Sequence, residues 1–139
     1  MLQILDILFH ITHLTVILIN CLGWSLAGWP RHCFLLVFSF TWVSWLGFGY
    51  WYGIGYCFLT DYHWQVKRQL GDARLPPSYI HFLLEEWFHL SIPRETVDQF
   101  VACIFIVLAG IYLNFLRKTF QTFFLCPNLF RCKFTEACL

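Results

Sequence analysis

Residues 4–29 read ILDILFHITHLTVILINCLGWSLAGW. The stretch is predominantly apolar, and it is longer than the ~20 residues that a helix needs to cross a lipid bilayer. Trp24 and Trp29 lie near its far end, where interfacial aromatic residues are typical of a transmembrane helix, and the Pro30-Arg31 pair then ends it. This stretch therefore predicts a membrane-spanning helix over about residues 4–29.

Two further stretches have the same character. Residues 33–58 are rich in Phe, Trp and Tyr, and residues 94–116 are largely apolar and end before Arg117-Lys118. The very short connection before residue 33 predicts an antiparallel hairpin of the first two helices. The predicted fold class is an all-α membrane protein, a bundle of three transmembrane helices with short interfacial helices.

The composition of the whole chain points the same way. Of its 139 residues, 59% are hydrophobic and 12% are charged, whereas soluble domains have roughly 45–50% apolar and about 25% charged residues. A water-soluble fold of this size could not bury so much apolar surface in one core. The net charge of +1 also lacks the basic excess typical of nucleic-acid-binding proteins. We expect the lipid bilayer to be the main partner, and no nucleic acid.

Two short amphipathic segments lie between the second and third spans. The first, residues 61–70, begins at Thr60-Asp61 and stops at Gly71. The second, residues 78–90, carries apolar residues at helical spacing opposite a polar face; the apolar residues are Ile80, Leu83, Leu84 and Trp87, and the polar ones are His81, Glu85, Glu86 and His89. Both segments predict interfacial helices. The transmembrane domain then covers residues 1–118, and residues 119–139 form a Cys-containing tail.

Polar residues form one stripe along the first span. Asp6, His10, His13 and Asn20 are separated by four, three and seven residues, which places them on one face of a helix. Ionisable groups are costly in hydrocarbon, so this face must point to the bundle interior or to a wet cavity. The stripe is either a proton relay or ligand site, or a set of interhelical hydrogen bonds that hold the bundle together.

The end of the second span offers a second candidate site. Tyr52, Tyr56 and Cys57 lie next to Gly49 and Gly53, whose spacing of four allows close helix approach. The aromatic side chains can line a flat pocket for a quinone or a lipid tail, or they can form an interfacial aromatic belt. Both interpretations stay open at this point.

Cofactor and enzyme signatures are weak. A bis-histidine haem site would need a partner for His10 or His13 on another segment, such as His63, and nothing in the sequence requires one. Glu86 and His89 form a single Glu-x-x-His pair, whereas di-metal bundles use two, so we predict no metal site. No cofactor is predicted, with haem or quinone as alternatives, and the lack of a catalytic motif favours a non-enzymatic role.

The order of several landmarks resembles a known family. They are His13, Gly23, the Trp29-Pro30-Arg31 turn, Cys57-Phe58-Leu59-Thr60 continuing as Asp61-Tyr62-His63-Trp64, Gly71, Ser78-Tyr79-Ile80, the Leu90-x-Ile92-Pro93-Arg94 entry to the last span, and Tyr112-Leu113-Asn114. Over about residues 5–116 the chain resembles the small bacterial integral membrane proteins known as domain of unknown function 2784. Many of its members carry a proline where this chain has Phe58.

That resemblance implies a compact helical domain in a bacterial inner (plasma) membrane and brings no assigned activity. It also draws attention to Asp61, His63 and Trp64, which are either a ligand or partner contact or a helix cap beside an interfacial tryptophan. The balance of positive charge favours an N-terminus outside and a C-terminus in the cytoplasm.

We expect a non-enzymatic subunit, assembly factor or interaction module of a membrane complex, in contact with other membrane proteins or with further copies of itself. The alternatives are a haem- or quinone-binding redox protein, and a proton or small-solute pathway along the polar stripe.

Overall fold

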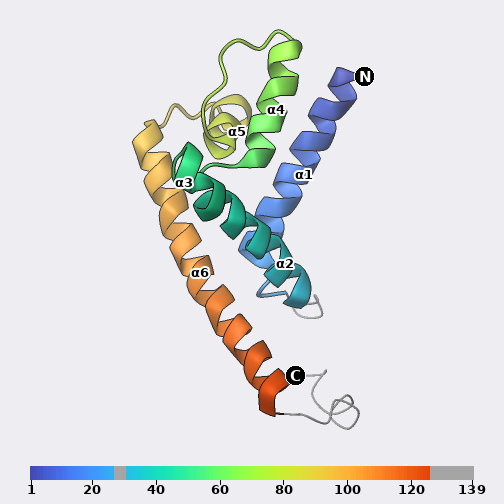
Figure 1. The fold of residues 1–139 in the computed structure, drawn as a ribbon. Helices are drawn as coiled ribbons and strands as arrows, with labels where there is room; N and C mark the ends of the chain where they lie inside the picture. Colours follow the sequence, from blue (N-terminus) through green and yellow to red (C-terminus); the bar gives the residue numbers. More distant parts are fainter. Residues whose placement is uncertain (27–30, 126–139) are drawn as a thin grey trace.

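The computed structural model describes residues 1–26 and 31–125, and side chains as far as residue 121. All regular structure in this part of the chain is helical, which confirms the predicted all-α class (Figure 1). The elements are α1 (Leu2–Leu22), α2 (Arg31–Trp42), the π-helical segment η1 (Val43–Phe48), α3 (Gly49–Tyr52), α4 (Phe58–Gln69), α5 (Tyr79–Phe88) and α6 (Arg94–Leu125).

Three helical stretches are long and apolar enough to cross a membrane. They are Leu2–Leu22, the continuous run Arg31–Tyr52 formed by α2, η1 and α3, and Arg94–Gln121. These are the three regions in which the sequence predicts spans. Their length and composition are compatible with a membrane protein.

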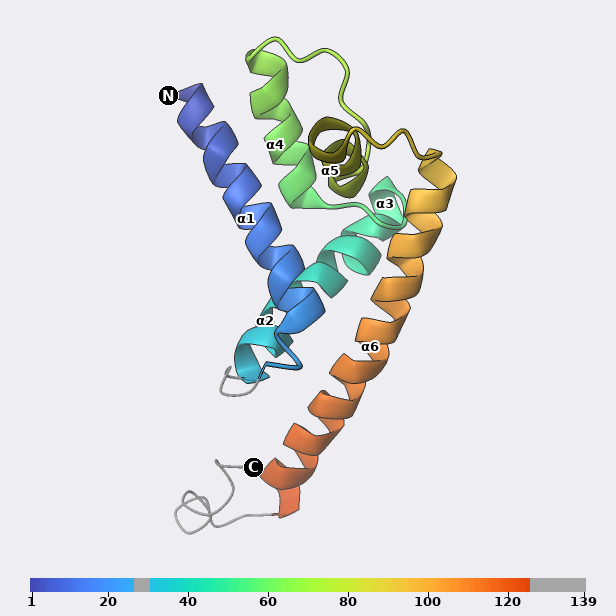
Figure 2. The same ribbon diagram turned by 180° about the vertical axis from the view of Figure 1, so that it is seen from behind.

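The three long helical stretches lie side by side, and the short helices α4 and α5 cover one end of them; we call these two helices the cap. In both views α1 and α6 lie on opposite sides of α2, while α4 packs beside the N-terminal half of α1 and α5 lies near the start of α6 (Figures 1 and 2). Phe34 and Phe38 of α2 pack with Leu108 of α6 in one apolar core. Trp64, Tyr79 and Phe82 form a second core between α4 and α5. The first core joins α2 to α6, and Ile17 of α1 packs against the second.

Helix α1 buries polar residues and exposes apolar ones. Its buried residues are His13 and Asn20. Its exposed residues include Ile4, Ile7, Leu8, Ile11 and Leu18. Such an inverted pattern is the one expected of a helix in lipid, where the exposure of apolar side chains costs little free energy.

The ends of the first two spans differ from the predicted ones. Helix α1 ends at Leu22, because the Trp24 indole donates to the Cys21 carbonyl oxygen and Ser25 donates to that of Leu22, which satisfies the last turn. Predicted residues 27–29 lie outside the described part of the chain. The second span ends at Tyr52 instead of residue 58, because Gly53 and Gly55 adopt φ of 105° and 89°, which only glycine adopts readily.

The shorter helices and the last span also begin or end elsewhere than predicted. Helix α4 starts at Phe58, so Thr60 and Asp61 lie in its first turn and do not cap it. Helix α5 buries Tyr79, His81 and Phe82, whereas Trp87 of the predicted apolar face is 53% exposed. Tyr79 and Phe82 face the rings of α1 and α4, and this contact sets the buried side. Helix α6 continues to Leu125 without a break at the predicted boundary after residue 118.

The α2–α6 core yields a stability prediction. Phe38 is 0% exposed and Phe40, on the same helix, is 68% exposed. Phe38→Ala should lower the free energy of unfolding by about 3 kcal/mol, near the lower end for a buried phenylalanine, because among lipid-facing helices only packing is lost. Thermal or denaturant unfolding in detergent measures the change. Phe40→Ala is the control and should change stability by less than about 0.5 kcal/mol; equal losses in both variants would contradict the core assignment.

Candidate functional site

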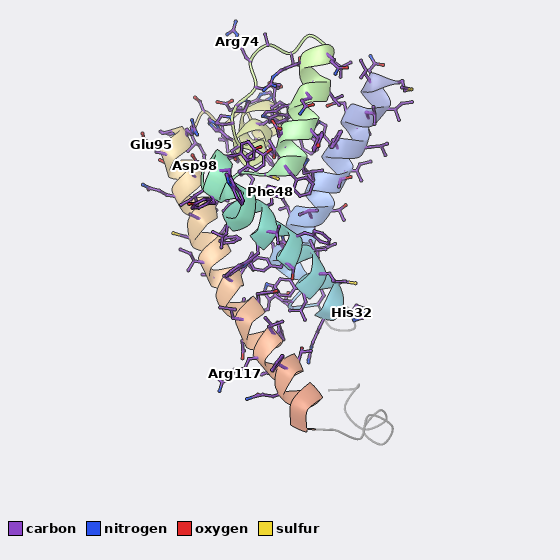
Figure 3. The ribbon with its side chains drawn as sticks, viewed as in Figure 1. His32, Phe48, Arg74, Glu95, Asp98 and Arg117 are labelled. Carbon is purple, nitrogen blue, oxygen red and sulfur yellow. The ribbon has the colours of Figure 1, made fainter. Side chains whose placement is uncertain are left out.

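A cluster of polar side chains joins α1 to the cap formed by α4 and α5. We call it the polar cluster, and it comprises Asp6, His10 and His13 of α1, Thr60, His63 and Lys67 of α4, and Tyr79 of α5. His13, Thr60, His63, Lys67 and Tyr79 are buried, and Asp6 and His10 are partly exposed. Figure 3 draws the side chains of the molecule, with Arg74 labelled at the end that holds α4 and α5.

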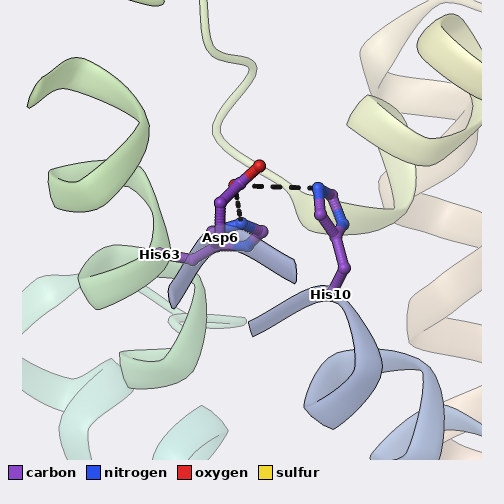
Figure 4. A group of neighbouring side chains, drawn as sticks. All are labelled: Asp6, His10 and His63. Carbon is purple, nitrogen blue, oxygen red and sulfur yellow. Dashed lines mark hydrogen bonds and ion pairs between the residues drawn. The ribbon is translucent and has the colours of Figure 1, made fainter. Parts of the chain in front are cut away.

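Asp6 is the centre of the polar cluster. Its Oδ1 atom lies 2.7 Å from His63 Nε2, 3.4 Å from Lys67 Nζ and 3.8 Å from His10 Nε2. Figure 4 shows both imidazole rings directed at the carboxylate from two different helices. The short contact is a hydrogen bond that the His63 ring donates, and Lys67 completes an ion pair.

Two further hydrogen bonds extend the polar cluster. His10 Nδ1 and the Tyr79 hydroxyl are 2.9 Å apart, which connects α1 to α5. His13 Nδ1 lies 3.1 Å from the Phe9 carbonyl oxygen, an acceptor, so this nitrogen carries the proton. His13 Nε2 therefore accepts from the Thr60 hydroxyl at 3.1 Å. Each histidine of α1 thus has a defined partner in the cap.

Burial determines the protonation of the cap residues. Burial is the main cause that lowers the pKa of His63, although its hydrogen bond to Asp6 acts in the opposite direction. Burial, with the nearby Asp6 charge, raises the pKa of Tyr79 to about 12. At neutral pH His63 is therefore a neutral imidazole, and Tyr79 keeps its phenolic proton.

The rings of the polar cluster are tightly packed. His63 is 0% exposed, and its ring stacks on Phe9 with 5.3 Å between centroids. The His10 and His63 rings meet edge to face at 4.5 Å. A porphyrin between these two histidines would require α1 and α4 to move apart.

The remaining predicted site residues lie elsewhere. Asn20 donates to Thr41 Oγ1 on α2 at 2.9 Å, so the polar stripe of α1 contacts α4 and α5 at one end and α2 at the other. Tyr52 and Tyr56 stack at 4.8 Å, and Tyr52 is 69% exposed. Cys57 is the residue immediately before α4.

Asp61 and Trp64 have structural contacts. Asp61 accepts a hydrogen bond from the Tyr56 hydroxyl at 3.3 Å. The expectation of an interfacial Trp64 is wrong: Trp64 is 4% exposed, and its indole donates to the Pro76 carbonyl oxygen at 2.6 Å. An indole whose N–H donates to a backbone carbonyl oxygen keeps its hydrogen bond when it is buried, so Trp64 belongs to the core of the cap.

The sequence alone did not identify Thr60, Lys67 and Tyr79 as members of the polar cluster. The spacing in the sequence did contain one indication of Lys67. His63 and Lys67 are four residues apart and lie on one face of α4, as Asp6 and His10 do on α1. A carboxylate in an apolar helix needs cationic or donor partners, and the α4 face supplies both.

The polar cluster also contains a set of metal-ligand types. Asp6, His10 and His63 each offer one ligand atom, and these three atoms lie within 4.8 Å of one another. The prediction of no metal site considered residues close in sequence, whereas Asp6 and His63 are 57 residues apart.

Comparison with known proteins gives one family and no individual relative. The family model described as Protein of Unknown function (DUF2784) matches residues 3–116, which confirms the family that the sequence landmarks indicate. The curated proteins and the solved structures gave no match to the chain.

The low pKa of His63 predicts that stability depends on pH. The unfolded chain binds a proton at His63 near its ordinary pKa of 6.5, whereas the folded protein binds it only at lower pH. The stability that His63 contributes is therefore fully present above pH 6.5 and is lost as the pH falls through the lower folded pKa. His63→Gln should show a smaller drop in melting temperature than the wild type between about pH 7.5 and about pH 5.5.

His32→Gln is the matched control, because His32 is exposed on α2 and labelled at the start of that helix in Figure 3. This variant should keep the full wild-type drop in melting temperature. An equally large drop in His63→Gln would show that other groups cause the pH dependence.

Proposed function

Because the chain belongs to the DUF2784 family, which is of unknown function, we propose from its geometry that it is a non-enzymatic helical module of a larger membrane assembly. The observation that carries this proposal is the uncovered face of α6. Helix α2 covers one side of α6, and along the other side the helix meets no element of the described chain (Figures 1 and 2).

The uncovered face of α6 combines apolar, small and polar residues. Its exposed residues are Cys103, Ile106, Val107, Gly110, Leu113 and Asn114. Apart from the backbone of its own helix and its chain neighbours, no described atom lies within 4 Å of the position that a Cβ atom on Gly110 would take, so another helix backbone can approach there. An amide such as that of Asn114 finds no hydrogen-bonding group in lipid tails, but it finds one on a neighbouring helix. These features favour a protein helix over lipid on this face.

The charged residues support a transmembrane placement. Arg74, Glu95 and Asp98 lie at the end that holds α4 and α5, whereas Arg117 lies near the opposite end of α6 (Figure 3). We place the chain in a bacterial inner membrane with the N-terminus and the polar cluster outside and the C-terminus in the cytoplasm. The bilayer then covers the apolar faces of α1 and α6.

A proton pathway is the second candidate, because the polar cluster connects several donors and acceptors. It requires further chains, since three helices cannot enclose a path across a bilayer. In liposomes, proton flux should fall in His10→Ala and His13→Ala if this alternative holds, and unchanged flux would exclude it. The expectation of no bound cofactor stays a prediction.

Cross-linking at Cys103 tests the proposed assembly. In a variant that keeps only this cysteine, a short bis-maleimide added to native membranes should join α6 to a second protein, because Cys103 lies on the uncovered face. Mass spectrometry of the product distinguishes a second copy of the chain from another membrane protein. Cys103→Ala should give no product.

Gly110→Leu should reduce the cross-linked product several-fold, because the added side chain blocks close approach of a helix. The substitution meets open space within the chain itself, so the melting temperature of the purified protein should stay near that of the wild type. Ile11→Phe adds bulk at an exposed position of α1 and is the control. Equal cross-linking in Gly110→Leu and wild type, or none in either, would contradict the proposal.

A further inference from the structure

Three potential metal ligands converge where α1 meets α4. Asp6 and His10 lie one turn apart on α1, and His63 approaches the same carboxylate from α4 (Figure 4). We propose that Asp6, His10 and His63 bind a divalent first-row transition-metal ion, with zinc as the representative case. The proposal does not depend on the proposed assembly role, because it concerns a site within a single chain.

The distances are close to those that a metal ion requires. Ligand atoms around a tetrahedral zinc ion, each about 2.0–2.2 Å from the metal, are separated from one another by about 3.3 Å. Asp6 Oδ1 is 2.7 Å from His63 Nε2 and 3.8 Å from His10 Nε2, so one distance is shorter and the other longer than this value. The His10 and His63 ligand atoms lie within 4.8 Å of each other. The ion would take the place of the proton that His63 Nε2 donates to Asp6, and that proton would move to the unpartnered Nδ1 of the same ring.

The surroundings of His10 match those of a metal-bound histidine. A histidine that binds a metal through one ring nitrogen commonly donates a hydrogen bond from the other. His10 Nδ1 lies 2.9 Å from the buried Tyr79 hydroxyl, so its proton can be donated to that oxygen. The Nε2 lone pair then faces Asp6.

Lys67 competes with a metal ion for Asp6. Its Nζ atom lies 3.4 Å from Asp6 Oδ1 and 3.3 Å from Asp72 Oδ2, so it already has a second carboxylate partner. Lys67 can therefore release Asp6 to a metal ion and remain paired with Asp72. Lys67 and Asp72 also line a pocket of about 330 Å³ beside the polar cluster.

The donor set selects the class of metal. Two imidazole nitrogens and one carboxylate oxygen suit zinc, ferrous iron and related ions, whereas calcium and magnesium favour oxygen ligands only. Three protein ligands leave at least one coordination position for water or another small ligand. The site is thus expected to be an open one.

Zinc titration of the full chain in detergent, against a fluorescent chelator, tests the proposal. The protein carries an affinity tag other than polyhistidine and the substitutions Cys126→Ser, Cys132→Ser and Cys138→Ser, which remove the thiols of the tail. We expect one zinc ion per chain. His10→Ala and His63→Gln should each weaken binding at least about tenfold, and His81→Ala, which removes a buried histidine outside the site, should leave it unchanged.

The variant Lys67→Met distinguishes a metal site from a cluster whose contacts are purely structural. Removal of the competing ammonium should tighten zinc binding several-fold, even though an ion pair to Asp6 is lost. Cobalt substituted for zinc should show d–d absorption bands without thiolate charge-transfer bands. Unchanged zinc affinity in His10→Ala and His63→Gln, or an affinity that stays the same or falls in Lys67→Met, would overturn the proposal.

Discussion

The pairing of Asp6 is the constraint on which the rest of the cap depends. A carboxylate within a predominantly apolar helix is costly unless cations and hydrogen-bond donors surround it. Asp6 receives both from a single face of α4, through His63 at 2.7 Å and Lys67 at 3.4 Å. This pairing fixes the rotation of α4 against α1. The position of α5 follows, because the Tyr79 hydroxyl meets His10.

The two halves of the structure are stabilised in different ways. Helices α2 and α6 pack through aromatic and aliphatic side chains around Phe34 and Phe38, with a hydrogen bond between Ser39 and the Tyr112 hydroxyl at 2.8 Å. Helix α1 instead uses polar groups on its inner face, toward α4 and α5 at one end and toward α2 at Asn20. Polar contacts specify a unique arrangement where lipid offers no hydrophobic preference between helices.

The sequence predicts the spans well and their ends less well. Apolar length alone locates the three long helices, because few other structures can accommodate such stretches. Their ends depend on local details such as the positive φ of Gly53, which composition does not reveal. Similarly, the inward face of α1 follows from the spacing of Asp6, His10 and His13. Its partners do not, because His63 and Tyr79 reach it only through the tertiary fold.

The length of α6 has a mechanical consequence. The helix has 32 residues, which correspond to about 48 Å at a rise of about 1.5 Å per residue, whereas a hydrocarbon core is about 30 Å thick. In the proposed transmembrane placement a helix this long would tilt or project from the bilayer, with Arg117 near its end in the headgroup region. Its tilt would then respond to bilayer thickness. Since α6 contacts both α2 and α5, a change of lipid composition would reach the cap of the molecule as a change of helix angle.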